Sequence, residues 1–423
     1  MLKQYIKQAI EQLRENTLVS VISIAGTALA IAVILVMVLV FQINSAGYAP
    51  ETHRGRMLFV NGTRVTQKDG SSNQGAMSVR VARECFYSLR EPEAVSVFYE
   101  NDSRPLSLPD KRRFEEYKVT HADAGFWRVF DYTFIEGQPF TEADFHSAIP
   151  RMVLTEGVAR ALFGGESAVG RTVVMDFVNY TVCGVVREAA SPLMTSHFEA
   201  CVPYSCDESL MTPSSSVYGG NTGPLNAVML ARSSGDFGKI RDELERRTAQ
   251  YNAAQTDFTV DFMNCPFSQL EQAMGASAWR KVDWSDYLVD RGAFLLFLLI
   301  VPALNLTGVV QSSVQKRKEE IGVRKAFGAT GGDVMRQVLS ENLVLTCIGG
   351  VIGIGLSLLL LVLCKSFVLD ESVTLTPAML FRPGLFLAAL LLTFLLNGLS
   401  AIIPAWRTMR SPIVDSLRGA EQI

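Results

Sequence analysis

The sequence lacks any phosphate-binding loop of the form GxxxxGK[ST] in its 423 residues. In such a loop, backbone amides hold the phosphates of a nucleotide, while the lysine and the hydroxyl residue contact phosphate and magnesium. Residues 328–332 are rich in glycine, but Asp333 and Val334 follow where the lysine and the hydroxyl residue would be required. We therefore expect no ATPase site of this kind in the chain, and no catalytic residue.

Metal-binding residue types are also scarce. The four histidines lie far from one another and from the cysteines, which predicts solvated or core roles and no metal site: His53, His121, His146 and His197. Two of the seven cysteines, Cys347 and Cys364, fall in an apolar run. The other five are an odd number, so at least one is unpaired, and a local bridge between Cys201 and Cys206 stays open.

Charged residues make up only 19% of the chain, and the net charge is −3. Between about residues 44 and 286 the charges of both signs are scattered, with no basic cluster. Because nucleic-acid binding depends on clustered Lys and Arg, a nucleic acid is not an expected partner.

Long apolar runs are what the chain has instead. A helix of about 20 apolar residues crosses the roughly 30 Å hydrocarbon core of a bilayer. Four segments meet this requirement and are predicted to be transmembrane helices: 17–43, 287–315, 338–364 and 383–406. The first could alternatively be a secretory signal, although its apolar run is longer than a typical signal core.

Basic residues on the short connecting segments predict the orientation. Lys and Arg accumulate on short cytoplasmic segments. Twelve lie in residues 1–17, 316–341 and 406–423, whereas the two in 365–382 are balanced by Asp370 and Glu371. We therefore expect cytoplasmic termini, an extracytoplasmic domain at 44–286 and a short extracytoplasmic loop at 365–382. Residues 1–16 place apolar side chains at helical spacing, which predicts a cytoplasmic amphipathic helix.

The densest charge cluster lies between the second and third spans. It reads Lys-Glu-Glu-Ile-Gly-Val-Arg-Lys-Ala-Phe-Gly-Ala-Thr over 318–330, and a glycine-rich segment follows at 349–353. This pattern resembles the signature of MacB-type ABC transporter permeases, in the MacB/LolC/FtsX-like superfamily. The closing segment, Pro404–Trp406 and Pro412–Arg418, is similar to the end of the same proteins.

The resemblance implies an α-helical membrane protein with four transmembrane helices and a large two-lobed extracytoplasmic α/β domain inserted between helices 1 and 2. It implies a coupling helix in 316–337, which would contact a separate nucleotide-binding subunit, and a cytoplasmic tail at 407–423. The residues implied for ATPase coupling are Glu319, Glu320, Ile321, Gly322, Arg324, Lys325, Gly328 and Ala329. Negative charge at the start of this helix and positive charge near its end complement the helix dipole.

The expected partners are a separate ABC ATPase, a second permease subunit, membrane lipid and, in one of two roles, a periplasmic adaptor with an outer-membrane protein. The chain itself is expected to bind no cofactor, because ATP and magnesium would belong to the ATPase. The implied location is the bacterial inner membrane. The two roles left open are export and mechanical signalling with lipoprotein extraction. An ATP-independent receptor with a ligand-binding outer domain is the alternative from another class.

Two further expectations concern packing and local structure. Gly349, Gly350 and Gly353 permit close helix packing, although glycine is common in membrane helices anyway. In the outer domain, residues 126–135 suggest an aromatic-rich helix. Residues 152–186 suggest a strand, a helix over Glu156–Phe163 and then two strands.

Overall fold

The computed structural model describes residues 17–45, 47–110, 114–188, 196–212, 218–283 and 330–363, with scattered positions in 285–293 and 384–395. The chain divides into two compact units. One contains most of helix α2 (Thr17–Ser45) and helix α12 (Gly331–Leu363). The other is built on Gln42–Asp283 and carries all of the β-strands described.

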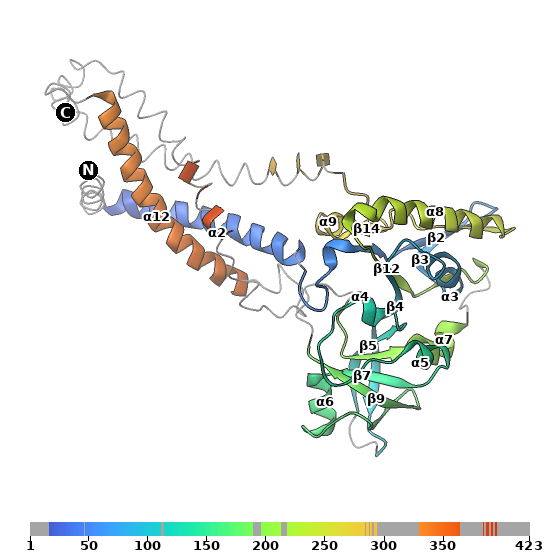
Figure 1. Cartoon of the computed structure of the whole chain (residues 1–423). Coiled ribbons are helices and arrows are strands. Elements are labelled where there is room, and N and C mark those ends of the chain that lie inside the picture. The colour runs from blue at the N-terminus through green and yellow to red at the C-terminus, as the bar shows by residue number, and fades with distance from the viewer. Residues whose placement is uncertain are drawn as a thin grey trace. The chain divides into compact units, whose positions relative to one another are not determined.

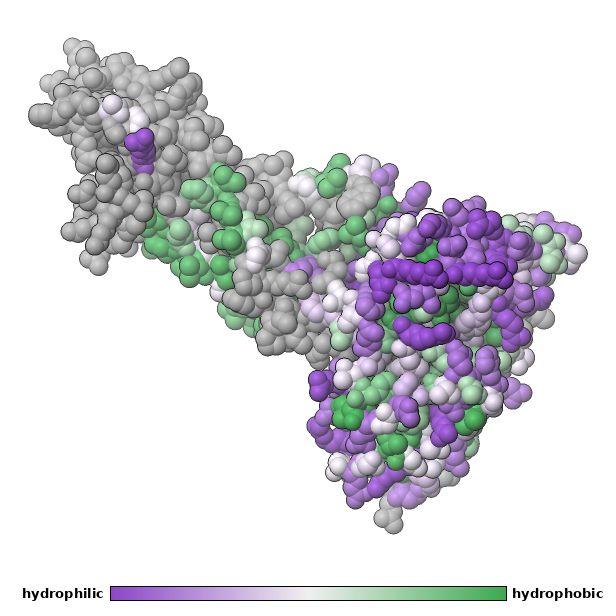
Figure 2. All heavy atoms as spheres, viewed as in Figure 1, coloured by the Kyte–Doolittle hydropathy of each residue, from purple (hydrophilic) through white to green (hydrophobic). Residues whose placement is uncertain are grey.

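Helices α2 and α12 are apolar and long. Ile24–Ile43 and Thr346–Leu363 are each long and apolar enough to cross a membrane. They fall in the predicted first and third spans, and Figure 2 shows apolar residues gathered along both helices. The predicted second and fourth spans lie almost wholly outside the described residues, so the number of four stays a prediction.

The second unit contains a ten-stranded mixed sheet (Figure 1). Its main order is β14-β1-β12-β4-β5-β10-β7-β9-β6, and β8 pairs with β4 and β9. Most pairs are antiparallel, while β10 with β5 and β7 with β9 are parallel. The bounds are β1 Met57–Val60, β4 Ala94–Ser107, β5 Phe114–Ala122, β6 Phe134–Gly137, β7 Arg151–Thr155, β8 Thr172–Met175, β9 Val178–Val186, β10 Ala200–Pro203, β12 Asn226–Leu230 and β14 Phe267–Ser268.

A four-stranded antiparallel sheet lies in the same unit, in the order β11-β3-β2-β13. Its bounds are β2 Thr63–Gln67, β3 Ser72–Met77, β11 Thr222–Gly223 and β13 Phe258–Asp261. Helix α8 packs against β13 and against the π-helical turn η2. The charged face of α8 is visible as a hydrophilic stripe in Figure 2.

Short helices join the strands, and several begin with a side-chain cap. In α5 the Thr141 hydroxyl accepts from Asp144 N, and the Asp144 side chain accepts from the Thr141 backbone. Ser268 and Glu271 do the same for α9, so the first amides of both helices are satisfied. The helix bounds are η1 Arg54–Arg56, α3 Val79–Val81, η2 Ala82–Phe86, α4 Phe126–Val129, α5 Glu142–His146, α6 Glu156–Phe163, η4 Tyr204–Cys206, α7 Glu208–Met211, η6 Ser234–Asp236, α8 Phe237–Ala253 and α9 Gln269–Ala273.

Two of the local predictions have different outcomes. The strand, helix and two strands expected over 152–186 are confirmed as β7, α6, β8 and β9. The aromatic-rich helix expected over 126–135 is wrong beyond Val129, because Phe130 takes an extended conformation and β6 follows. The aromatic rings pack on one another from a helix, a loop and a strand, so the periodicity reflects a cluster and not one helical face.

Candidate functional site

The predicted coupling residues, Glu319 to Ala329, lie outside the described residues. Their role stays a prediction. Helix α12 begins at Gly331, directly after that segment, and continues through the glycine-rich stretch.

The glycines of α12 face α2 at two positions. A Cβ atom added to Gly349 would lie 3.1 Å from Cβ of Thr27, and one added to Gly353 would lie 2.8 Å from the Ala28 carbonyl oxygen. The two helices therefore approach so closely that only glycine fits at Gly353 without displacement. Gly350 is buried, whereas a Cβ on Gly355 would meet nothing within 4 Å. A functional role for this close packing stays a prediction.

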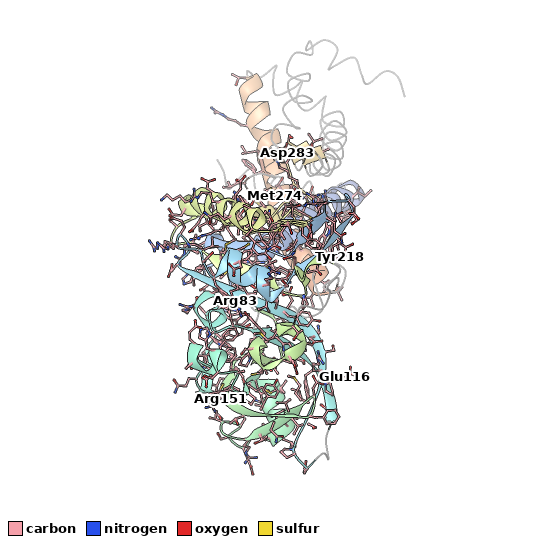
Figure 3. All side chains as sticks on the ribbon, turned by 90° about the vertical axis from the view of Figure 1, so that its right-hand side faces the viewer. Arg83, Glu116, Arg151, Tyr218, Met274 and Asp283 are labelled. Atoms are coloured by element: carbon pink, nitrogen blue, oxygen red, sulfur yellow. The ribbon has the colours of Figure 1, made fainter. Side chains whose placement is uncertain are left out.

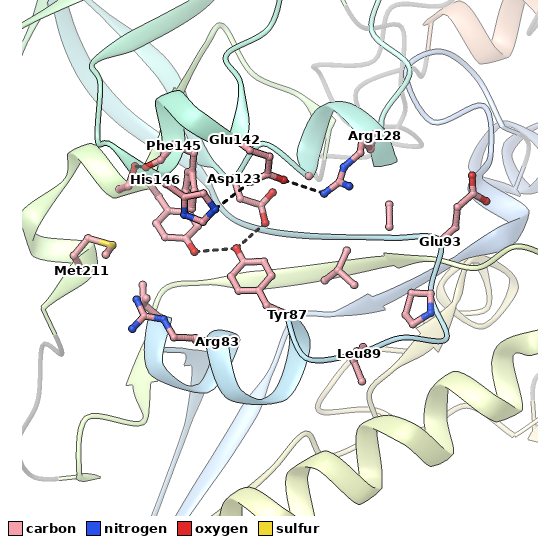
Figure 4. A pocket seen from close by; sticks show the side chains of 17 residues that line it. Arg83, Tyr87, Leu89, Glu93, Asp123, Arg128, Glu142, Phe145, His146 and Met211 are labelled. Atoms are coloured by element: carbon pink, nitrogen blue, oxygen red, sulfur yellow. Dashed lines mark hydrogen bonds and ion pairs between the residues drawn. The ribbon is translucent and has the colours of Figure 1, made fainter.

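A cavity of about 740 Å³ opens in the second unit (Figure 4). Its walls come from four stretches of chain: the run from α3 through η2 to the start of β4, the β5–α4 turn with α4, α5, and η4 with α7. The volume falls within the range of about 300–1,000 Å³ that is usual for small-molecule sites. This cavity is the candidate binding site of the second unit.

Asp123 lies at the inner wall of the cavity and is fully buried. Its carboxylate accepts hydrogen bonds from the Tyr87 hydroxyl at 2.6 Å, the Ser96 hydroxyl at 2.9 Å and the amides of Val97 and Phe126 at 2.8 and 3.0 Å. Burial raises the pKa of Asp123 to about 6, and these four hydrogen bonds oppose the rise. The carboxylate thus holds the turn before α4 against β4.

Two tyrosines extend this network into the cavity. The Tyr87 hydroxyl, which donates to Asp123, is also 2.9 Å from the Tyr204 hydroxyl. Burial and the Asp123 carboxylate raise the pKa of Tyr87 well above its usual value, so the phenol stays protonated and keeps its hydrogen bond to Asp123. The ring of Phe145 meets that of Tyr204 edge to face at 4.7 Å. Three aromatic side chains thereby form one wall.

Ion pairs occupy the rim. Arg128 Nη2 lies 3.0 Å from Glu142 Oε1, and His146 Nε2 lies 3.7 Å from the other oxygen of the same carboxylate. Glu93 pairs with Arg56 at 3.0 Å. The acidic groups of the cavity are therefore matched by cationic or hydrogen-bond-donating neighbours, as the dashed lines of Figure 4 show for Glu142 and Asp123.

Comparison with known proteins assigns both halves of the chain. Residues 20–247 match the MacB-like periplasmic core domain, and residues 292–413 match the FtsX-like permease C-terminal domain. The first match covers more than half of the 423 residues. The chain belongs to the MacB-like ABC transporter permease family.

Two relatives illustrate the family. The macrolide export ATP-binding/permease protein MacB of Chromobacterium violaceum is 25% identical over 292 residues, which is 69% of this chain and 42% of MacB. The uncharacterized ABC transporter permease YknZ of Bacillus subtilis is 25% identical over 280 residues, which is 62% of this chain and 66% of YknZ. This chain therefore spans less than half the length of that MacB protein.

A solved structure also resembles this MacB-like permease. The periplasmic region of MacB from Actinobacillus actinomycetemcomitans is 15% identical, with a TM-score of 0.33. The likeness covers 48% of this chain and 88% of the solved one.

The MacB-like outer domain holds a second group of buried charges, just after α2. Glu51 and Arg54 are each 1% exposed, and Arg54 Nε lies 3.0 Å from Glu51 Oε2. Glu100 on β4 lies near them. Burial and the Glu51 carboxylate raise the pKa of Glu100 to about 7, while a hydrogen bond from Asn226 lowers it. A buried ion pair of this kind fixes the conformation of the segment that leaves α2, because separating the charges in an apolar interior is costly.

Two cysteines and one histidine that the sequence singled out lie among the described residues of this MacB-like domain. Cys201 and Cys206 are free thiols, so the local bridge between them is not formed. His121 is buried, and its Nε2 lies 3.3 Å from Asp102 Oδ2. Among the described residues, no three His, Cys, Asp or Glu side chains are grouped so that they could hold a metal ion.

Sequence reasoning did not identify the cavity or the buried charges. Tyr87, Asp123 and Tyr204 are 36 and 81 positions apart along the chain, and no motif connects them. One weak signal was available: a single Asp just before the aromatic start of α4 is a residue that a core tolerates only with partners.

Proposed function

We propose that this chain is the membrane permease subunit of an ABC transporter and that the ATPase is a separate subunit. The observation that carries the proposal is the order of its parts: an apolar helix, a MacB-like periplasmic core domain and then an FtsX-like permease domain. In this proposal ATP and magnesium bind the partner, which is consistent with the absence of a phosphate-binding loop from these 423 residues.

The proposed architecture has four transmembrane helices, cytoplasmic termini and an outer domain between helices 1 and 2, in the inner membrane. The supports are the two candidate spans and the basic residues on the short segments. Four helices are few for a transport path, so a working unit with two permease subunits is part of the proposal.

ATP-driven closure of the ATPase pair would move the segment 316–337, and rigid helices would carry the movement to the outer domain. Two features support such transmission. Helices α2 and α12 are packed at Gly349 and Gly353, and the segment after α2 is fixed by the buried Glu51–Arg54 pair. Export with an adaptor and an outer-membrane protein, and mechanical work on a lipoprotein, both use this movement.

One experiment tests the proposal directly. The chain is solubilised in detergent from its native cells and recovered by affinity, and co-purifying proteins are identified by mass spectrometry. We expect an ATP-binding subunit in near-equal amount. Recovery of the intact chain without any ATPase would contradict the proposal.

The cavity of about 740 Å³ favours one other function, an ATP-independent receptor that binds a ligand with its outer domain. The same experiment separates the two functions, because a receptor needs no ATPase. Addition of ATP to the recovered complex gives a second readout: hydrolysis that is stimulated by the permease supports the transporter.

A further inference from the structure

Arg83 is the charged side chain that distinguishes the cavity. It lies on η2, its side chain is exposed, and it lines the cavity from the side opposite α5 (Figure 4). Figure 3 shows it between the part of the unit that carries Met274 and the part that carries Arg151. Among the described residues, Arg83 has neither an ion pair nor a hydrogen bond.

The other charged groups around the cavity have partners. Glu142 is paired with Arg128 and His146, and Glu93 is paired with Arg56. The Asp123 carboxylate receives four hydrogen bonds from its own surroundings. Among the described residues that line the cavity, Arg83 is therefore the charged side chain whose hydrogen-bond donors are open to a ligand.

Arg83 also lies close enough to the aromatic wall to influence it. Its positive charge lowers the pKa of Tyr204, against the larger effect of burial, which raises it. Tyr87 as a residue is 41% exposed, although its hydroxyl is engaged with Asp123 and Tyr204, and it lines the cavity. Apolar side chains continue the wall, among them Leu89, Phe145 and Met211.

A guanidinium group binds a carboxylate or a phosphate through two parallel hydrogen bonds, and such bonds are stronger where water is partly excluded. Aromatic and aliphatic side chains beside it favour an apolar group on the same ligand. The carboxylates around the cavity already have partners, so Arg83 is the charged group that a ligand can engage.

We propose that this cavity binds an amphipathic organic anion, with its carboxylate or phosphate on Arg83 and its apolar part against Tyr87, Tyr204 and Phe145. Such a molecule would be the substrate class of the permease, and that assignment, unlike the binding itself, rests on the proposed function. The cavity would then be the place where the outer domain meets its cargo before the membrane helices move.

Binding is tested with the full chain in lipid nanodiscs by isothermal titration calorimetry, without ATP. Three probes are compared: N-acetyl-leucyl-phenylalanine, its C-terminal amide, and phenyl phosphate. Empty nanodiscs correct for partition into lipid. The variants are Arg83→Met, Arg83→Lys and the control Arg90→Met, which removes an exposed arginine that does not line the cavity.

We expect the carboxylate or the phosphate probe to bind and the amide to bind at least tenfold more weakly. Arg83→Met should weaken anion binding about ten- to hundredfold, the loss expected for a charge-assisted hydrogen-bonded pair. Arg83→Lys should retain part of the affinity, and Arg90→Met should match the wild type. Whichever anion binds more tightly identifies the ligand's anionic group.

Equal binding of the acid and its amide would overturn the proposal, as would unchanged affinity in Arg83→Met or the absence of binding by every probe. None of these results depends on an ATPase. Failure here therefore leaves the permease assignment intact, and failure to recover an ATPase leaves this result intact.

Discussion

At the scale of single residues, the buried charges are the least expected part of the molecule. Glu51 and Arg54 are three positions apart, and both side chains are almost fully enclosed. Lys, Arg, Asp and Glu are rarely buried unless they are paired, and removal of one partner leaves the other charge without compensation. The pair therefore makes the segment after α2 sensitive to single substitutions.

Arg54→Met is expected to destabilise the outer domain by about 3–5 kcal/mol, because Glu51 would remain buried without its cation. A loss of that size lowers the melting temperature by on the order of 10 °C for a domain of this length. The measurement is thermal unfolding of the purified chain in detergent. The control is Arg160→Met, which removes the exposed pair with Glu156 and should cost about 0.3–0.5 kcal/mol. Similar melting of the two variants would refute a structural role for the buried pair.

Glu100 predicts a pH dependence of stability. Its pKa is about 7 in the folded protein, and that of an unfolded chain is near the ordinary 4.5. Between these values unfolding releases a proton, so stability falls as pH rises from about 4.5 to 7, by roughly 1.4 kcal/mol per pKa unit or about 3 kcal/mol in all.

Glu100→Gln keeps a side chain that can accept from Asn226 and removes the ionisation. The variant should melt at a higher temperature than the wild type at pH 7 and above, and the difference should shrink toward pH 4.5. Parallel melting curves for the two proteins across this pH window would show that Glu100 is not the group responsible.

The sequence could not have predicted the residue-scale site. Asp123 acquires its hydrogen bonds from η2, β4 and the start of α4, and these elements meet only through the pairing of strands that are remote in sequence. Arg83 likewise looks like any exposed arginine on a short helix. Arg83 differs from the other charged residues of the cavity wall because they have partners. No local sequence pattern shows which charged residues are paired.

At the scale of elements, prediction from the sequence was most accurate where the structure depends on residues that are close together in the chain. In the segment 151–186, β7 and β8 are short apolar runs, the first part of β9 alternates apolar and polar residues, and Gly164, in a left-handed conformation at φ 67°, closes α6. Those signals predict β7, α6, β8 and β9. The 126–135 prediction failed because aromatic residues at mixed spacing can pack together without forming one helix.

The packing of α2 with α12 gives a matched pair of substitutions. Gly353→Ala places a methyl group 2.8 Å from the Ala28 carbonyl oxygen and 2.9 Å from Cβ of Ile31, so the helices must separate. We expect a destabilisation of about 1–3 kcal/mol, as for other overpacked contacts. Gly355→Ala, two residues further along the same helix, meets nothing within 4 Å and serves as the control.

The stability of both variants is measured as the fraction of monodisperse protein that survives heating in detergent. A loss of stability in Gly353→Ala alone would support the close contact between α2 and α12 at this position. Equal behaviour of the two alanine variants would mean that α12 tolerates a side chain on this face, and the packing interpretation would have to be withdrawn.

At the scale of the whole molecule, the order of apolar and polar segments carries most of the information. Spans, loops and a long inserted domain are read from hydropathy and charge, which act over tens of residues and do not require knowledge of contacts. The two family matches follow the same order. The topology of the ten-stranded sheet cannot be predicted from hydropathy and charge in this way. It depends on contacts between distant residues, because β1 pairs with β12 and β14 from the far end of the domain.

The predicted coupling segment 316–337 concerns the assembly as a whole. If Glu319 and Glu320 begin a helix that docks on the ATPase, their replacement by lysine would put positive charge at the positive end of the helix dipole and reverse the charge at the contact. Glu319→Lys with Glu320→Lys should therefore reduce recovery of the ATPase at least tenfold, while the permease remains intact in the membrane.

The control makes the same change of charge elsewhere. Asp242→Lys with Glu245→Lys alters two exposed residues of α8 in the outer domain and should leave ATPase recovery unchanged. Recovery is quantified by mass spectrometry relative to the permease, at low and at high salt, because docking through exposed charges weakens as salt rises. If both double variants retained the ATPase equally, residues 319 and 320 would have no part in docking. Loss in both would trace the effect to net charge, whereas loss in the first alone assigns the contact to the cytoplasmic segment.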